Sequence, residues 1–120
     1  MKGHRADRIA EMIHGELAVR LHRDIKDPRV TPISITGVKV TGDLKKAVIE
    51  WMPLGGGEVP QELRDGLKEV SHKLRGPIGR ALRLRHAPEL VFEHDVRTDE
   101  AIRVSQLLER LAHDREERNE

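Results

Sequence analysis

The chain has no cysteine, hardly any aromatic residues and no long hydrophobic run. Without cysteine it can form neither a disulfide framework nor a thiolate metal site, as is usual for proteins of a reducing cytosol. Trp51 and Phe92 are the only Phe, Trp or Tyr residues, so the exposed rings on which RNA-recognition sheets and oligonucleotide-binding barrels stack bases are missing. No apolar run approaches the roughly 18 residues of a membrane span, and the N-terminus lacks the apolar stretch of a signal peptide. We therefore expect a soluble cytoplasmic protein.

The charges are many but nearly balanced. Charged residues make up 36% of the 120 residues and the formal net charge is +1, so the total identifies no partner. Cations are in excess at the N-terminus and from Lys73 to Pro88, whereas acids are in excess over residues 50–69 and 98–120. A cation cluster without acids faces either a polyanion, which neutralises its self-repulsion, or solvent. On composition alone both interpretations stay open.

Hydrophobic periodicity in the first half of the chain predicts a helix followed by a β-hairpin. Apolar residues at steps of four predict an amphipathic helix over residues 6–25, which ends before Pro28. Alternation then predicts a strand from Ile33 to Val40, with a β-bulge at Gly37 where the period slips, and a return strand from Lys45 to Met52. The tip of this hairpin is expected to carry Lys45 and Lys46.

The second half predicts two further helices, a strand and a last helix. An apolar stripe from Leu63 to Leu74 predicts a helix, which Gly76-Pro77 is expected to end before a short helix over residues 77–84 begins. A third strand is expected at residues 90–92, and a last helix is expected to open at Thr98. The short helix should turn Ile78, Ala81 and Leu82 inward and leave Arg80 and Arg83 outside. The apolar side of the last helix should consist of Ala101, Val104, Leu107, Leu108 and Leu111.

This order of elements predicts an α+β fold. The sequence α-β-β-α-α-β, followed by a C-terminal helix, gives a three-stranded mixed sheet that the helices pack on one face. We expect residues 1–112 to form this domain. Residues 113–120 are expected to be a charged tail that frays.

No catalytic or metal-binding pattern is present in the sequence. The seven histidines form neither His-x-x-x-His nor His-Glu-x-x-His. The densest group of possible ligands, Glu93-His94-Asp95, falls on a strand whose successive side chains point to opposite sides, which favours a solvated strand end over a metal site. We therefore expect neither an enzyme nor a bound metal or cofactor.

Two glycine features leave alternatives open. Gly76-Pro77-Ile78-Gly79 matches the Gly-x-x-Gly backbone clamp of KH domains. Its proline removes an amide donor and its middle residues lack a cation, so a helical break is the favoured interpretation. Gly66, inside the second predicted helix, costs about 1 kcal/mol relative to alanine. It marks either a close packing approach or a tolerated weak point.

Three stretches of the sequence closely resemble the ribosome-binding factor A family. They are Arg5-Ala-Asp-Arg-Ile-Ala-Glu-Met-Ile, Lys26-Asp-Pro-Arg-Val30 and Leu82-Arg-Leu-Arg-His-Ala-Pro-Glu-Leu-Val-Phe-Glu-His-Asp95. The resemblance covers roughly residues 4–111. It implies a type-II KH-like fold and a bacterial maturation factor that binds the free small (30S) ribosomal subunit and its 16S rRNA. It also implies a role in late assembly and in growth in the cold, without catalytic activity.

The resemblance has one departure. In that family an Ala-x-Gly kink between two helices stands in for Gly-x-x-Gly, and the equivalent place here reads Val70-Ser71-His72. The kink is expected either at Ser71-His72 or at Gly76-Pro77.

The charge distribution and the resemblance together select the candidate RNA-binding residues. We expect the arginines near the bend to lie together on one exposed ridge and to grip rRNA phosphates. The candidates are Arg5, Arg8, Lys45, Lys46, Ser71, His72, Lys73, Arg75, Arg80, Arg83 and Arg85.

The alternative function is a protein-interaction module that binds no RNA. It would dock a partner through its amphipathic helices or its acidic C-terminal segment, and the cations would be incidental. In either case we expect a monomer.

Overall fold

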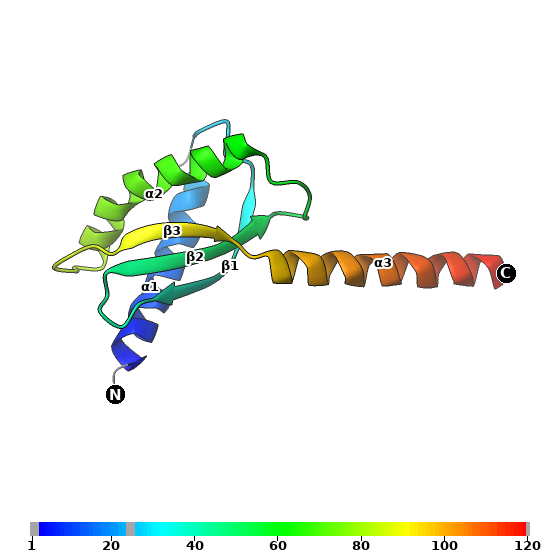
Figure 1. The fold of residues 1–120 in the computed structure, drawn as a ribbon, viewed down its shortest axis with the longest axis horizontal. Helices are drawn as coiled ribbons and strands as arrows, with labels where there is room; N and C mark the ends of the chain where they lie inside the picture. The colour runs from blue at the N-terminus through cyan, green and yellow to red at the C-terminus, as the bar shows by residue number, and fades with distance from the viewer. Residues whose placement is uncertain (1–2, 24–25, 120) are drawn as a thin grey trace.

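The computed structural model describes residues 3–23 and 26–119 and shows an α+β fold (Figure 1). Its elements are α1 (Gly3–Arg23), β1 (Ile33–Val40), β2 (Lys46–Pro53), α2 (Gln61–Ala81), β3 (Glu89–His94) and α3 (Val96–Asn119). The three strands lie in the order β1-β2-β3, with β1 and β2 antiparallel and β2 and β3 parallel. The predicted α+β fold with a three-stranded mixed sheet and a C-terminal helix is therefore confirmed.

The predicted bulge in the first strand is also confirmed. The register between β1 and β2 shifts between Ile35 and Gly37, so that Thr36 is the extra residue. The bulge keeps apolar side chains of β1 on the same face before and after it, where they pack against the core. This face of β2 carries Ala47, Ile49 and Trp51, all at most 1% exposed.

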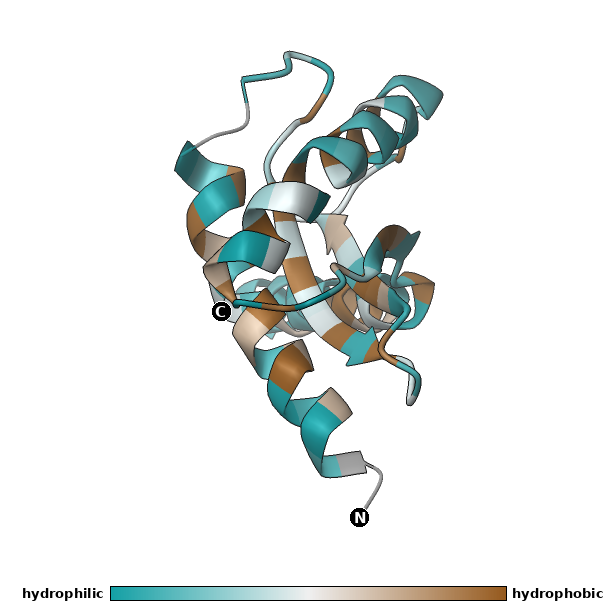
Figure 2. Ribbon diagram, turned by 90° about the vertical axis from the view of Figure 1, so that its left-hand side faces the viewer, coloured by the Kyte–Doolittle hydropathy of each residue, from teal (hydrophilic) through white to brown (hydrophobic). Residues whose placement is uncertain are grey.

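Helices α1 and α2 cover that apolar face and form the core with it. In Figure 2 hydrophobic segments recur at intervals along α1, the helix nearest the N-terminus. These intervals follow from the helical repeat, which brings Ile9, Ile13 and Leu17 to the side facing the sheet. Met12 and Ala18 of the same helix are exposed, and Ile25, the last residue of the predicted helix, lies outside the described residues.

Helix α2 is a single helix, so the break predicted at Gly76-Pro77 is wrong. Pro77 cannot donate a hydrogen bond to the carbonyl of Lys73, which is why proline in a helix interior is normally costly. Here Leu74 and Ile78, at 4% and 0% exposure, hold the helix to the core on either side of the proline. Packing therefore overrides the local preference. Both places considered for a kink lie within this one helix.

The end of α2 differs from the prediction in one further respect. The helix stops at Ala81, whose side chain is exposed rather than turned inward. Ile78 is fully buried as expected, and Leu82 is half-buried against the core.

Helix α3 begins earlier than predicted because Asp95 caps it. The carboxylate of Asp95 accepts the backbone N–H of Thr98 at 3.1 Å and its hydroxyl at 2.7 Å. It also accepts the hydroxyl of the bulge residue Thr36 at 2.6 Å. These hydrogen bonds, that from Thr36 first, lower the pKa of Asp95. The cap thus joins the start of α3 to β1.

Beyond its first turns α3 projects away from the sheet (Figure 1). Its predicted apolar side does not pack: Val104, Leu107, Leu108 and Leu111 are 53–61% exposed. Helices α1 and α2 already cover the apolar face of the sheet, and the other face carries charged side chains such as the Lys39–Glu50 pair. The helix continues through residues 113–119, and their fraying in solution stays a prediction.

A helix that crosses a membrane must be long and apolar. Within residues 3–23 and 26–119, no helix combines the necessary length with sufficient apolar character.

Candidate nucleic-acid interface

A groove of about 390 Å³ runs between α2 and the outer strand β3. We call it the α2–β3 groove. Its lining residues are Trp51, Arg64, Leu67, Lys68, Ser71, His72, Arg75, Glu89, Leu90, Val91 and Phe92.

One side of α2 lines this groove with three cations and a histidine. Arg64, Lys68, His72 and Arg75 recur at spacings of four, four and three residues, which places them on the same side of a helix. His72 and Arg75 were predicted from the sequence, whereas Arg64 and Lys68 were missed. Their helical spacing to His72 and Arg75 was the signal that could have found them.

The floor of the α2–β3 groove offers little aromatic surface to a base. Trp51 is 1% exposed, and its ring is tilted by 34° against that of His94, with ring centroids 5.3 Å apart. Phe92, the other aromatic residue of the lining, is half-buried. Ser71 is 7% exposed, and its hydroxyl donates to the carbonyl of Lys68 at 2.6 Å. The charged side chains of the groove are therefore exposed, whereas the residues beneath them are mostly buried. This arrangement suits contact with a phosphate backbone.

A second hollow, of about 540 Å³, lies beside the groove at the C-terminal end of α2. We call it the end hollow. It brings together cations from α1, the β1–β2 turn, α2 and the segment before β3. They are Arg5, Lys45, Arg75 and Arg85, together with His86. Arg75 lines both the groove and the hollow, so the two adjoin at this residue.

Arg75 also holds the segment before β3 against α2. Its Nε and Nη2 donate to the carbonyl oxygen of Ala87 at 3.1 and 3.0 Å. Gly79 allows the same approach from the helix, since a Cβ atom there would lie 2.7 Å from the Cβ of Ala87. The glycines of Gly76-Pro77-Ile78-Gly79 thus belong to one helix and its packing.

The other predicted residues lie outside both hollows. Lys46 is exposed on the opposite face of the sheet, because it alternates with the buried Ala47. Arg8 is exposed on α1, and Arg80 lies along α2, with Nη1 3.2 Å from the place that a Cβ of Gly76 would take. The predicted single ridge is therefore divided. Within the described part of the chain, no ion pair joins Arg5, Lys45, Arg64, Lys68, Arg75, Arg80, Arg83 or Arg85 to a carboxylate.

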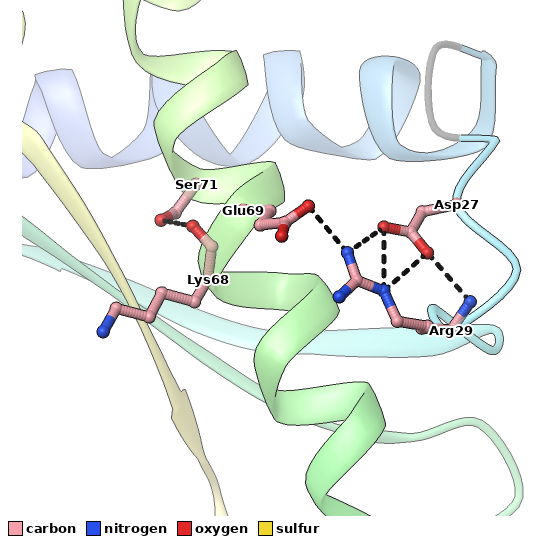
Figure 3. A network of polar contacts seen from close by, with 5 residues as sticks. All are labelled: Asp27, Arg29, Lys68, Glu69 and Ser71. Atoms are coloured by element: carbon pink, nitrogen blue, oxygen red, sulfur yellow. Dashed lines mark hydrogen bonds and ion pairs between the residues drawn. The ribbon is translucent and has the colours of Figure 1, made fainter.

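A network of hydrogen bonds centred on Arg29 lies on the far side of α2 (Figure 3), and Lys73 is close enough for its charge to act on Asp27. There Arg29 donates to Asp27 at 2.6 Å and to Glu69 of α2 at 2.7 Å. The hydrogen bonds from the Arg29 side chain and backbone, with a smaller contribution from the charge of Lys73, lower the pKa of Asp27 to about 2. The same carboxylates raise the pKa of Arg29. This network fastens the loop before β1 to α2.

The segment Glu93-His94-Asp95 has a structural role, so the prediction of a solvated strand end is wrong. Nε2 of His94 lies 3.0 Å from Oδ2 of Asp99, a residue that is 2% exposed. Asp95 caps α3. Arg103 lies 3.4 Å from the other oxygen of Asp99 and donates to the carbonyl of Gly57. Among the residues that the structure describes, no group of three or more His, Asp or Glu side chains is arranged to hold a metal ion.

Comparison with known proteins identifies a family that matches most of the chain. The family model of ribosome-binding factor A matches residues 5–108. The ribosome-binding factor A of Desulforamulus reducens is 41% identical over 108 residues, which cover 90% of each chain. That of Geobacter sulfurreducens is 38% identical over 107 residues, covering 89% of this chain and 91% of the relative.

Two structures share the fold. The crystal structure of ribosome-binding factor A from Thermus thermophilus is 21% identical, with a TM-score of 0.54, and covers 78% of this chain and 96% of that one. A homology model of the Thermus thermophilus protein, fitted into a cryo-EM map of its complex with 30S, is 20% identical, with a TM-score of 0.53, and covers 76% and 91%. At these identities the likeness concerns the fold alone.

Proposed function

Because the chain belongs to the ribosome-binding factor A family, we propose that it binds the free 30S ribosomal subunit through 16S rRNA. In this proposal it acts in the cytoplasm as a monomer and assists late assembly and processing of the subunit, including in the cold. It catalyses no reaction itself. It holds one arrangement of unfinished rRNA and then leaves.

One observation supports rRNA as the direct contact. The α2–β3 groove and the end hollow adjoin at Arg75 and carry exposed arginine and lysine side chains that form no ion pair with a carboxylate within the described part of the chain. Arginine and lysine side chains left unpaired in this way attract phosphate oxygens, and arginine can grip two of them at once. The binding energy would come from backbone charge rather than from base stacking.

The alternative, a protein-interaction module, is favoured by a different observation. The apolar side of α3 is exposed, and acids are in excess over residues 98–120. In this function α3 would be the contact with a partner, and the cations of α2 would be dispensable.

Charge reversal on the two surfaces separates the two functions. We expect Arg64→Glu with Lys68→Glu to abolish co-sedimentation with free small subunits while circular dichroism shows an intact fold. Arg110→Glu reverses the charge of an exposed residue on α3 and should leave co-sedimentation unchanged. If instead the α2 variant still binds and Arg110→Glu does not, the RNA proposal is wrong and the alternative function is supported. Assembled ribosomes serve as the comparison for the free subunit.

A further inference from the structure

Two residues with an unusual backbone conformation lie in the lining of the end hollow or directly before it in the chain. Leu44 and Arg83 are the only non-glycine residues with positive φ within residues 3–23 and 26–119, at 63° and 55°. Leu44 lines the hollow just before Lys45, and Arg83 precedes Leu84, Arg85 and His86, which also line it. The left-handed conformation is costly for residues with a Cβ, and such residues cluster at functional sites.

Both positions are ones that glycine usually fills. Leu44 follows a turn closed by the hydrogen bond from its N–H to the carbonyl of Thr41 at 2.8 Å, where hairpins commonly place a left-handed glycine. Arg83 follows the last turn of α2, where the N–H groups of Arg83 and Leu84 donate to the carbonyls of Arg80 and Gly79 at 3.1 and 2.9 Å. This is the Schellman arrangement, whose left-handed residue is most often glycine.

The side chains of Leu44 and Arg83 differ in how much they contribute to the stability of the fold. Leu44 is half-buried and packs against the core. Arg83 is exposed, and its side chain makes no hydrogen bond or ion pair with any residue that the structure describes. Glycine would make the same turn with less strain. The presence of arginine at this position therefore has no structural benefit within the folded chain.

The charges around the hollow indicate an anionic ligand. Arg5, Lys45, Arg75 and Arg85 line it, whereas Asp43 is its one carboxylate. Asp43 is engaged within the turn: it accepts the hydroxyl of Thr41 at 2.7 Å and the N–H of Lys45 at 3.1 Å. The lining therefore has an excess of positive charge, with four cations against one carboxylate.

We propose that the end hollow is a discrete phosphate-binding site, and that Arg83, which directly precedes the lining residue Leu84, contacts the same phosphate. The proposal rests on the proposed function for the source of the ligand, a phosphodiester group of rRNA. The left-handed turn at Arg83 brings Arg85 and His86 back across the end of α2, where they meet Lys45 and Arg5. A phosphate there would be contacted from four separate parts of the chain, namely α1, the β1–β2 turn, α2 and the segment before β3.

Substitutions at Arg83 separate this role from a structural one. Arg83→Gly keeps the turn and removes the cation, so we expect the melting temperature to rise by about 2–5 °C while affinity for free small subunits falls about three- to tenfold. Arg83→Lys should restore much of the affinity. Arg110→Ala, which removes an exposed cation of α3 far from both hollows, is the control and should bind nearly as well as the wild type. A stabilised Arg83→Gly variant with wild-type affinity would overturn the proposal.

A second measurement tests the hollow without the ribosome. Inorganic phosphate titrated into the ¹⁵N-labelled full chain should shift backbone amide resonances of residues 43–45 and 83–87, and Lys45→Gln should weaken those shifts. Shifts of equal size around Lys73 and Arg110 would mean unspecific binding and would overturn the proposal. If phosphate binds in the hollow but the wild type does not bind small subunits, the proposed function fails and the anion site stands.

Discussion

At the scale of single residues, Gly66 lets α2 approach the loop that follows α1. A Cβ atom at this position would lie 2.9 Å from Cγ2 of Val30 and 3.2 Å from Cβ of Arg29. Of the two explanations left open for Gly66, the structure favours close packing. Gly15, in the middle of α1, differs because nothing lies within 4 Å of its Cβ position.

These two glycines give a matched pair of substitutions. Gly15→Ala should raise the free energy of unfolding by about 1 kcal/mol, the usual gain in helix propensity. Gly66→Ala gains the same propensity but overpacks a stiff β-branched neighbour, which costs about 1–3 kcal/mol. We therefore expect Gly66→Ala to lower the free energy of unfolding by about 1 kcal/mol. Urea denaturation of both variants measures this, and equal stabilisation by both would contradict the packing explanation.

Asp27 predicts a pH dependence of stability. Its pKa is lowered to about 2 from an ordinary value of 3.8, mainly by hydrogen bonds from Arg29. A lowered carboxylate pKa contributes stability above the ordinary value, and that contribution is lost as the pH falls through the folded-state pKa. Asp27→Asn should therefore be less stable than the wild type at pH 7, and the difference should shrink between about pH 4 and pH 2.

Thermal unfolding at several pH values measures this difference. Asp114→Asn, which removes an exposed carboxylate of α3, controls for the change in net charge. A difference between wild type and Asp27→Asn that stays constant down to pH 2 would show that the Asp27–Arg29 pair does not supply the effect.

At the scale of elements, α3 depends on the contacts at its first turns. Asp95 caps the helix, Asp99 contacts His94, and Arg103 donates to the carbonyl of Gly57. From Glu100 onward every described residue of α3 is exposed. Isolated helices are marginal in water, because most helical stability in proteins comes from packing of an apolar face.

Hydrogen exchange should therefore show a gradient along α3. Amides near Asp99 should be the best protected, and those of residues 113–119 the least protected, in line with the fraying predicted for the tail. Asp95→Ala removes the cap and should lower the free energy of unfolding by about 0.5–2 kcal/mol. It should also reduce protection of α3 while leaving that of α2 unchanged. Uniform protection along α3 would contradict this account.

At the scale of the whole molecule, the formal net charge of +1 hides a separation of charge. The α2–β3 groove and the end hollow gather cations at one part of the surface, whereas acids are in excess over residues 98–120 of α3. Attraction to a polyanion depends on this local concentration of charge rather than on the total.

The binding of small subunits should therefore depend steeply on salt. Each neutralised phosphate releases counterions, so two phosphates alone would weaken binding about 25-fold between 50 and 300 mM salt, and more contacts would weaken it further. Sedimentation at several salt concentrations gives the slope. Lys68→Glu should make the slope shallower, whereas Arg110→Glu should not. An affinity that stays constant over this range would rule out the electrostatic mechanism.

By itself, the sequence determined the features that depend on neighbouring residues. Apolar periodicity is local, and it sufficed to predict the α+β fold, the hairpin and the bulge at Gly37. The tertiary structure alone decided the features that depend on residues distant in the chain. Burial of Leu74 and Ile78 keeps α2 helical at Pro77. Because α1 and α2 already cover the apolar face of the sheet, α3 stays exposed. The candidate cations are divided for the same reason: sequence patterns locate charges along the chain, but only packing decides which of them share a surface.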